Sequence, residues 1–132
     1  MSIPTLAPYA GLLGLLYLVL CWRVVALRRT HAIGMGDGGN ESLARAIRVQ
    51  ANFNEYVPLI LVLLFVLAAT GASRYLIDAL GIALVIGRLL HAQGLGRVSG
   101  RSFGREVGTG LTWLVLAVAA LAALAKALRP FL

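Results

Sequence analysis

Four long apolar runs dominate the sequence, and each is close to the length that an α-helix needs to cross a bilayer. They occupy about residues 6–27, 51–72, 75–92 and 107–128. A spanning helix needs roughly 20 apolar residues, because each residue adds about 1.5 Å along the axis. The composition agrees, since 60% of the 132 residues are hydrophobic and 13% are charged, against roughly 45–50% and 25% in soluble domains. The sequence therefore predicts a single all-α integral membrane domain over residues 1–132, built as a four-helix bundle.

The basic residues indicate how this bundle is oriented. The chain has 12 Lys and Arg residues and a net charge of +7. These residues lie between the apolar runs and do not interleave with aromatic residues, so we expect no nucleic-acid partner. Nine of the 12 flank the first and third connections, whereas Arg74, Lys126 and Arg129 lie at the opposite side. By the positive-inside rule, both termini are expected outside and both long connections in the cytoplasm.

A stripe of polar side chains runs along the first half of the second apolar segment. At 3.6 residues per turn, six of its side chains fall within an arc of roughly 100°. Gln50 projects to nearly the opposite side of the same helix. The six residues of the stripe are Glu41, Arg45, Arg48, Asn52, Glu55 and Tyr56.

The third apolar segment carries a shorter polar stripe. Arg88 and His91 are three residues apart and share one helix face with Leu95. An arginine in a membrane helix costs roughly 2.5–3.5 kcal/mol on insertion scales, so both polar residues should face protein or water. If the stripes of the second and third segments face each other, they enclose a polar pocket. Its arginines would bind the carboxylates of a zwitterionic ligand, and Glu55 would bind the amine of that ligand. The alternative interpretation is that Arg48 and Glu55 simply pair with each other inside the bundle.

Two motifs on these stripes resemble the MAPEG family, the membrane-associated proteins of eicosanoid and glutathione metabolism. The chain length, the four spans and the long first connection are also similar to that family, so the resemblance covers essentially the whole chain. It implies a homotrimer of four-helix bundles, with glutathione bound at the subunit interfaces. The motifs are Arg48-x-Gln50-x-Asn52-x-x-Glu55-Tyr56-x-Pro58 and Gly87-Arg88-Leu89-Leu90-His91-Ala92-Gln93-Gly94.

The resemblance also implies a role for individual residues. Arg28 and Gln50 match glutathione contacts made by a neighbouring subunit, and Arg88 and His91 match pocket positions on the third helix. Four further residues match contacts from one subunit, namely Arg48, Asn52, Glu55 and Tyr56.

The catalytic arginine is where the sequence departs from the family pattern. In the leukotriene C4 synthase pattern an arginine at the start of the fourth helix stabilises the glutathione thiolate. The matching position here is Ser102, with Arg101 and Arg105 on either side, and we favour Arg105 because it is nearer the helix start. A second aromatic pocket position is occupied by Leu95, which removes a hydroxyl donor.

These implications yield three hypotheses for function. The first is a glutathione transferase, with or without peroxidase activity, that uses glutathione as co-substrate and conjugates it to a lipophilic electrophile. It would act in the inner membrane of a bacterium, among membrane lipids. The second is a non-catalytic scaffold of the same fold that binds lipid or glutathione, and the third is a small transporter. We expect no metal site, because His31 and His91 have no Cys or carboxylate at ligand spacing.

Two smaller features can each be interpreted in two ways. Gly100, Gly104 and Gly108 are spaced four apart, which is typical of close helix packing or of a flexible connection leading into a helix, and we favour the second. Asp78 in the third apolar segment is either a proton relay or a hydrogen-bonded carboxyl group near the outer interface. Again we favour the second interpretation.

Overall fold

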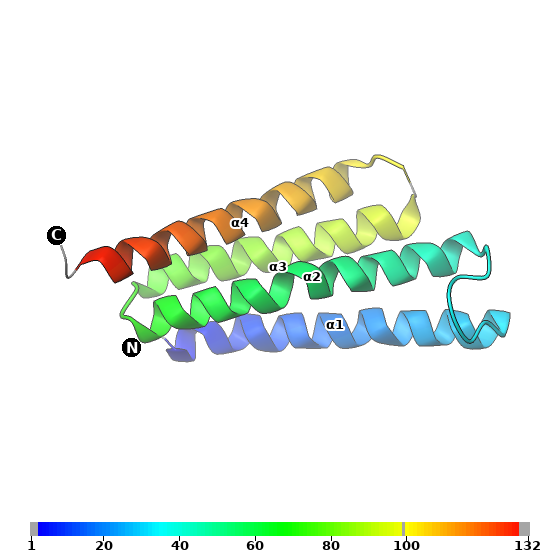
Figure 1. Cartoon of the computed structure of the whole chain (residues 1–132), viewed down its shortest axis with the longest axis horizontal. Coiled ribbons are helices and arrows are strands. Elements are labelled where there is room, and N and C mark those ends of the chain that lie inside the picture. Colours follow the sequence, from blue (N-terminus) through cyan, green and yellow to red (C-terminus); the bar gives the residue numbers. More distant parts are fainter. Residues whose placement is uncertain (1–2, 99, 130–132) are drawn as a thin grey trace.

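A computed structural model describes residues 3–98 and 100–129, which form an all-α bundle of four helices (Figure 1). The helices are α1 (Ile3–His31), α2 (Glu41–Ala69), α3 (Arg74–Arg97) and α4 (Phe103–Leu128). Each is long and apolar enough to cross a membrane. The predicted fold class is therefore confirmed. The helices extend beyond the apolar runs, since α2 begins at Glu41 and thus includes the whole polar stripe.

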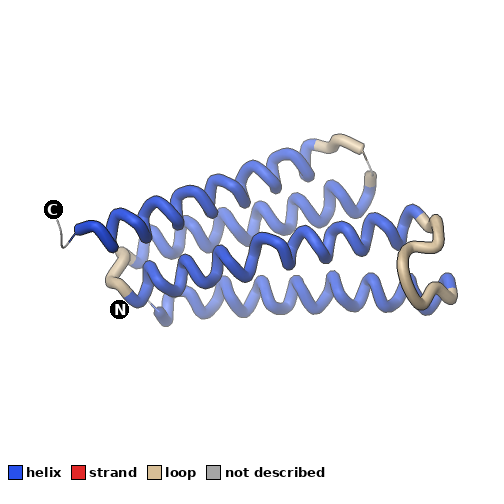
Figure 2. The backbone as a smooth tube through the Cα atoms, viewed as in Figure 1, coloured by secondary structure: helices blue, strands red, loops and turns tan. Residues whose placement is uncertain are grey.

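The two central helices of the bundle are α2 and α3. Helix α1 packs on both of them, and α4 packs on both from the other side, whereas α1 and α4 do not contact each other. Both described ends of the chain and the short α2–α3 turn lie at one end of the bundle (Figure 2). The connection 32–40 and the described residues between α3 and α4, 98 and 100–102, lie at the other end (Figure 2), which we call the loop end. This up-and-down arrangement places the polar halves of α2 and α3 together at the loop end.

Three helices begin at side-chain caps. Asn40 accepts a hydrogen bond from the Leu43 amide and so caps α2. Ser73 caps α3 and Ser102 caps α4 in the same way. Each cap satisfies an amide that the first turn of a helix leaves unpaired. Ser102, the residue that matches the arginine position of the leukotriene C4 synthase pattern, thus serves here as the cap of α4.

Helices α3 and α4 are in close contact through paired glycines. A Cβ atom on Gly108 would lie 2.5 Å from the Gly87 carbonyl oxygen, and one on Gly104 would lie 2.7 Å from the Leu90 carbonyl oxygen. Gly94 faces the backbone of Gly104. The favoured prediction of a flexible connection is therefore wrong for Gly104 and Gly108. Backbones can approach this closely only where side chains are missing, which allows tight packing between membrane helices.

Asp78 lies at the end of the bundle opposite the loop end and is hydrogen-bonded. The Tyr9 hydroxyl of α1 donates to its Oδ1 at 2.7 Å, and Arg74 lies 3.9 Å from its Oδ2. The tyrosine ring passes directly over Gly81, where any side chain would collide with it. The favoured interpretation of a hydrogen-bonded carboxyl group is confirmed. This contact joins α1 to α3 far from the polar stripes.

Candidate functional site

The first component of the site is an ion pair on the surface of α2. Arg48 donates from both terminal nitrogens to Glu55, at 3.1 Å and 3.2 Å. The residues are seven apart, which places them on one face two turns from each other. Their side chains remain 56% and 48% exposed. The expectation that they pair is thus confirmed, but the pair lies on an open face and does not serve as a buried brace.

The second component is a buried arginine on α3. Arg88 is 1% exposed. It donates to Asn52 Oδ1 at 2.8 Å and to Thr112 Oγ1 at 3.3 Å, and its Nη2 lies 3.2 Å from His91 Nδ1. The guanidinium also lies 5.7 Å from the centre of the Phe53 ring. One cation thereby links α2, α3 and α4.

This network fixes the orientation of two of its partners. Since Arg88 can only donate, the Asn52 carbonyl oxygen must face it, and the Asn52 amide group points the other way. By the same argument His91 Nδ1 is the acceptor, so the proton of the neutral ring is on Nε2. Asn52 is half-buried between this network and the outer face. The network therefore holds an amide donor in a fixed direction beside the Arg48–Glu55 pair.

A cavity of about 280 Å³ opens between α2 and α4 at the loop end. Arg48 contributes one wall and Arg105, in the first turn of α4, contributes the other. Leu95 forms part of the lining where the family pattern has an aromatic residue. Small-molecule sites usually have volumes of roughly 300–1,000 Å³, so this cavity is at the lower limit of a ligand site. The remaining lining residues are Glu41, Ala44 and Arg45.

The two candidate catalytic arginines share one cavity but differ in the other. Both Arg101 and Arg105 line a second cavity of about 490 Å³ together with Trp113, whereas only Arg105 also borders the α2–α4 cavity. Arg101 is 91% exposed and donates from Nε to Glu106 at 2.6 Å. This hydrogen bond raises the pKa of Arg101 above its ordinary value. The geometry brings Arg105, and not Arg101, to the cavity that Arg48 borders, and their catalytic roles stay predictions.

The remaining predicted contacts lie elsewhere. Gln50 points toward α1, as the helical projection predicts, and donates to the Tyr17 hydroxyl at 2.9 Å. Arg28 donates to the carbonyl oxygens of Ile33 and Gly36 and so holds the first connection. Tyr56 is half-buried and packs against the core. Arg28 and Gln50 are therefore not part of the α2–α4 cavity within one copy of the chain.

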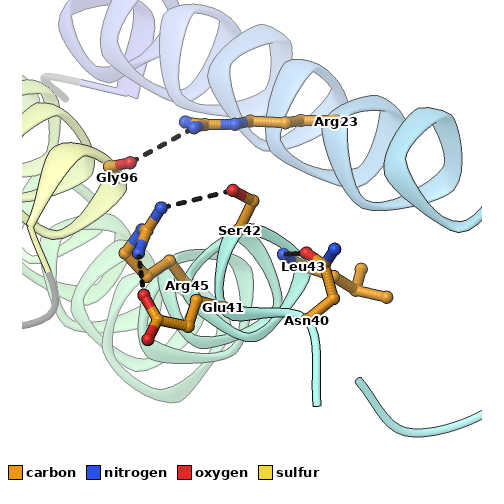
Figure 3. Close-up of polar contacts among 7 residues, drawn as sticks. All are labelled: Arg23, Asn40, Glu41, Ser42, Leu43, Arg45 and Gly96. Carbon is orange, nitrogen blue, oxygen red and sulfur yellow. Dashed lines mark hydrogen bonds and ion pairs between the residues drawn. The ribbon is translucent and has the colours of Figure 1, made fainter. Parts of the chain in front are cut away.

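Sequence reasoning did not name Arg45 and Thr112 as site residues. Arg45 lines the cavity and contacts Glu41 at 3.4 Å and Ser42 at 3.3 Å, as Figure 3 shows at the loop end of α2. The position of Arg45 on the polar stripe could have identified it as a site residue. The sequence indicates Thr112 only weakly, because it is a single hydroxyl residue in an otherwise apolar run. Its position against Arg88 depends on how α4 packs on α3.

Comparison with known proteins agrees with this architecture. The sequence profile of the MAPEG family matches residues 6–125. The chain is 37% identical over 117 residues to the inner membrane protein YecN of Escherichia coli strain K12, which covers 88% of this chain and 87% of that protein. The same values hold for the protein of that name in E. coli O6:H1. Together with its four spanning helices, these matches show that the chain belongs to the MAPEG family of integral membrane proteins.

Proposed function

We propose that the protein is a membrane-bound glutathione transferase, with or without peroxidase activity, that conjugates glutathione to a lipophilic electrophile. The observation that carries this proposal is the half-exposed Arg48–Glu55 pair, which lies beside a cavity shared by Arg48 and Arg105. These groups offer a cation for a carboxylate, an anion for an ammonium group and a second cation for a thiolate. Glutathione carries all three.

Opening the ion pair for a ligand costs little. An exposed pair contributes about 0–1 kcal/mol, because water already solvates both groups. Arg48 exchanges Glu55 for a glutathione carboxylate, to which its two donors are well matched. Glu55 is then released to accept from the glutathione amine. The Asn52 amide, whose direction Arg88 fixes, adds a donor beside them.

The chemical step follows from the position of Arg105. A free thiol has a pKa of about 8.5, and a nearby cation lowers it by favouring the thiolate. Arg105 lies in the first turn of α4, where the unpaired amides also favour negative charge. With an aryl halide, the thiol proton passes to solvent and the sulfur forms a bond to the ring carbon. The carbon–halogen bond breaks and the halide leaves with the electron pair.

The open face also calls for a covering partner. Glu55 lies near the loop end of the apolar segment 51–72, paired with Arg48 and half-exposed. An ion pair at that depth should face water or protein and not lipid. A second copy of this chain would cover that face, and a homotrimer supplies Arg28 and Gln50 from the neighbour. We place the assembly in the inner membrane of a bacterium, with the loop end in the cytoplasm.

Glutathione binding by the purified protein in detergent tests the proposal. We expect a glutathione-dependent rise in the thermal unfolding midpoint, thiolate absorbance in the ultraviolet, and conjugation of an aryl halide. R48Q and E55Q should each lose the rise. R74Q is the matched control, because it breaks another exposed ion pair at the opposite end of the bundle. If wild-type protein shows no glutathione-dependent shift, the proposal is wrong.

A second set of variants separates the two arginines. R105Q should retain the thermal shift and lose thiolate absorbance and conjugation, whereas R101Q should retain all three. The reverse result would assign the thiolate to Arg101.

The second candidate is a scaffold of the same fold that binds glutathione or lipid without catalysis. Two observations favour it: Leu95 lines the cavity in place of an aromatic hydroxyl, and Ser102 caps α4 in place of an arginine. A glutathione-dependent thermal shift with no thiolate and no turnover would support this candidate.

A further inference from the structure

A second charged groove lies on the other side of the bundle, between α1 and α3. It has a volume of about 320 Å³. Arg23, Gln93 and Arg97 line it at the loop end, and Leu16, Val19 and Leu89 line it toward the middle of the membrane. The α2–α4 cavity shares none of these residues. The groove therefore stands independently of the proposed glutathione site.

Arg23 is held across the mouth of this groove. Its Nη2 donates to the Gly96 carbonyl oxygen at 3.3 Å, so a side chain of α1 reaches over to α3 (Figure 3). A Cβ atom at residue 96 would lie 2.8 Å from the Arg23 guanidinium, so the arginine lies directly against the glycine backbone. A carbonyl oxygen does not neutralise a cation. The charge of Arg23 thus remains available at the groove.

The second cation, Arg97, is also without a carboxylate. In the part of the chain that the structure describes, the ion pairs join other arginines to Glu41, Glu55, Asp78 and Glu106. Neither Arg23 nor Arg97 is among them. Two cations at the mouth of one groove repel each other unless an anion lies between them.

The wall below the two arginines is apolar and open. Val19 is 60% exposed and Leu89 is 44% exposed. A small anion such as inorganic phosphate would use the arginines but not this wall. A molecule with an anionic head and a hydrocarbon tail matches both parts, and basic pockets between helices bind such headgroups at the membrane surface. We propose that this groove binds an anionic phospholipid, with its phosphate at Arg23 and Arg97 and one acyl chain along Val19 and Leu89.

Native mass spectrometry of the detergent-purified protein tests this site. We expect the protein to retain dioleoyl phosphatidylglycerol in preference to dioleoyl phosphatidylcholine. Each arginine near an anionic headgroup contributes about fivefold to the binding affinity, so the affinity of the doubly substituted R23Q/R97Q for the anionic lipid should fall about 25-fold. R29Q is the control, since it removes a charge from the same end of α1 without lining the groove.

Single substitution keeps the test informative if the double variant fails to fold. R97Q alters a side chain that makes no hydrogen bond or ion pair within the described residues. Its affinity for the anionic lipid should still fall about fivefold. Equal retention of the two lipids by wild type, or unchanged selectivity in R97Q, would overturn the proposal. So would complete displacement of the lipid by millimolar inorganic phosphate, because it would show that the acyl chain contributes nothing.

Bromine quenching in vesicles locates the lipid. Trp22 lies three residues after Val19 and is 62% exposed, whereas Trp113 is on α4. With W113F, brominated phosphatidylglycerol in a phosphatidylcholine vesicle should quench Trp22 more than brominated phosphatidylcholine does, and R97Q should remove the difference. With W22F, the remaining Trp113 should show no such difference. A preference at Trp113 alone would place the lipid elsewhere and contradict the assignment.

Discussion

The Arg48 and Arg88 clusters lie on adjacent central helices and look alike in sequence, yet the structure uses them differently. Arg48 pairs with a carboxylate on an open face and is about half-exposed. Arg88 is buried and donates to neutral partners on α2 and α4. A buried cation whose terminal nitrogens donate to side chains of three helices orders its surroundings, whereas an exposed pair can be exchanged for a ligand. The same residue type therefore supports the fold at one position and is available for chemistry at the other.

The largest effect on stability is expected from Arg88. R88M leaves Asn52 Oδ1 and His91 Nδ1 without their donor, and the free energy of unfolding should fall by roughly 2–4 kcal/mol. R29M on α1 is the control, because that side chain is exposed and lines neither the α2–α4 cavity nor the α1–α3 groove. Thermal unfolding followed by circular dichroism in detergent measures both. An unfolding midpoint of R88M equal to that of wild type would show that the buried cluster is not structural.

The next largest effect is expected at the α3–α4 contact that supports the Arg88 cluster. G108A would push a methyl group into the Gly87 carbonyl and His91 backbone, and overpacking of this kind costs roughly 1–3 kcal/mol. G110A tests the same substitution two residues further on, where a Cβ atom meets nothing within 4 Å. Alanine there should be neutral or mildly stabilising. Equal midpoints for the two variants would contradict the close packing.

A smaller effect is expected at the end opposite the loop end. Y9F removes the hydroxyl that donates to Asp78 at 2.7 Å but keeps the ring that packs over Gly81. Its unfolding midpoint should fall less than that of G108A, because solvent near the interface can replace the lost bond. Glutathione-dependent shifts should be unchanged. If Y9F lost glutathione binding, the end of the bundle that holds Tyr9 would not be purely structural. The contrast with the ligand-binding loop end would then be wrong.

The smallest effect on stability is expected at the open pair itself. R48Q removes an exposed ion pair, so the free energy of unfolding of the ligand-free protein should change by about 0–1 kcal/mol. The loss of glutathione binding proposed for the same variant would then be a loss of ligand contacts and not of fold. A fall in stability as large as that of R88M would instead make Arg48 a structural residue, and the two clusters would no longer differ.

Much of the candidate site could be read from helical spacing. The common face of Arg48, Asn52 and Glu55, and the opposite direction of Gln50, follow from 3.6 residues per turn within one helix. The hydrogen-bond partners on other helices could not be predicted in the same way. Arg88 and Thr112 are 24 residues apart in the sequence, so their hydrogen bond depends on how α3 and α4 pack.

The sequence by itself determined four spanning helices, their polar stripes and the family to which the chain belongs. These properties are local, because hydropathy, helical period and motif spacing are set by residues near one another in the chain. Only the tertiary structure decided that Gly104 and Gly108 form a tight interface, that Arg105 and not Arg101 borders the cavity, and that one arginine is buried while another is open. Those outcomes depend on how closely backbones from different helices approach, and that distance is set by packing across the bundle.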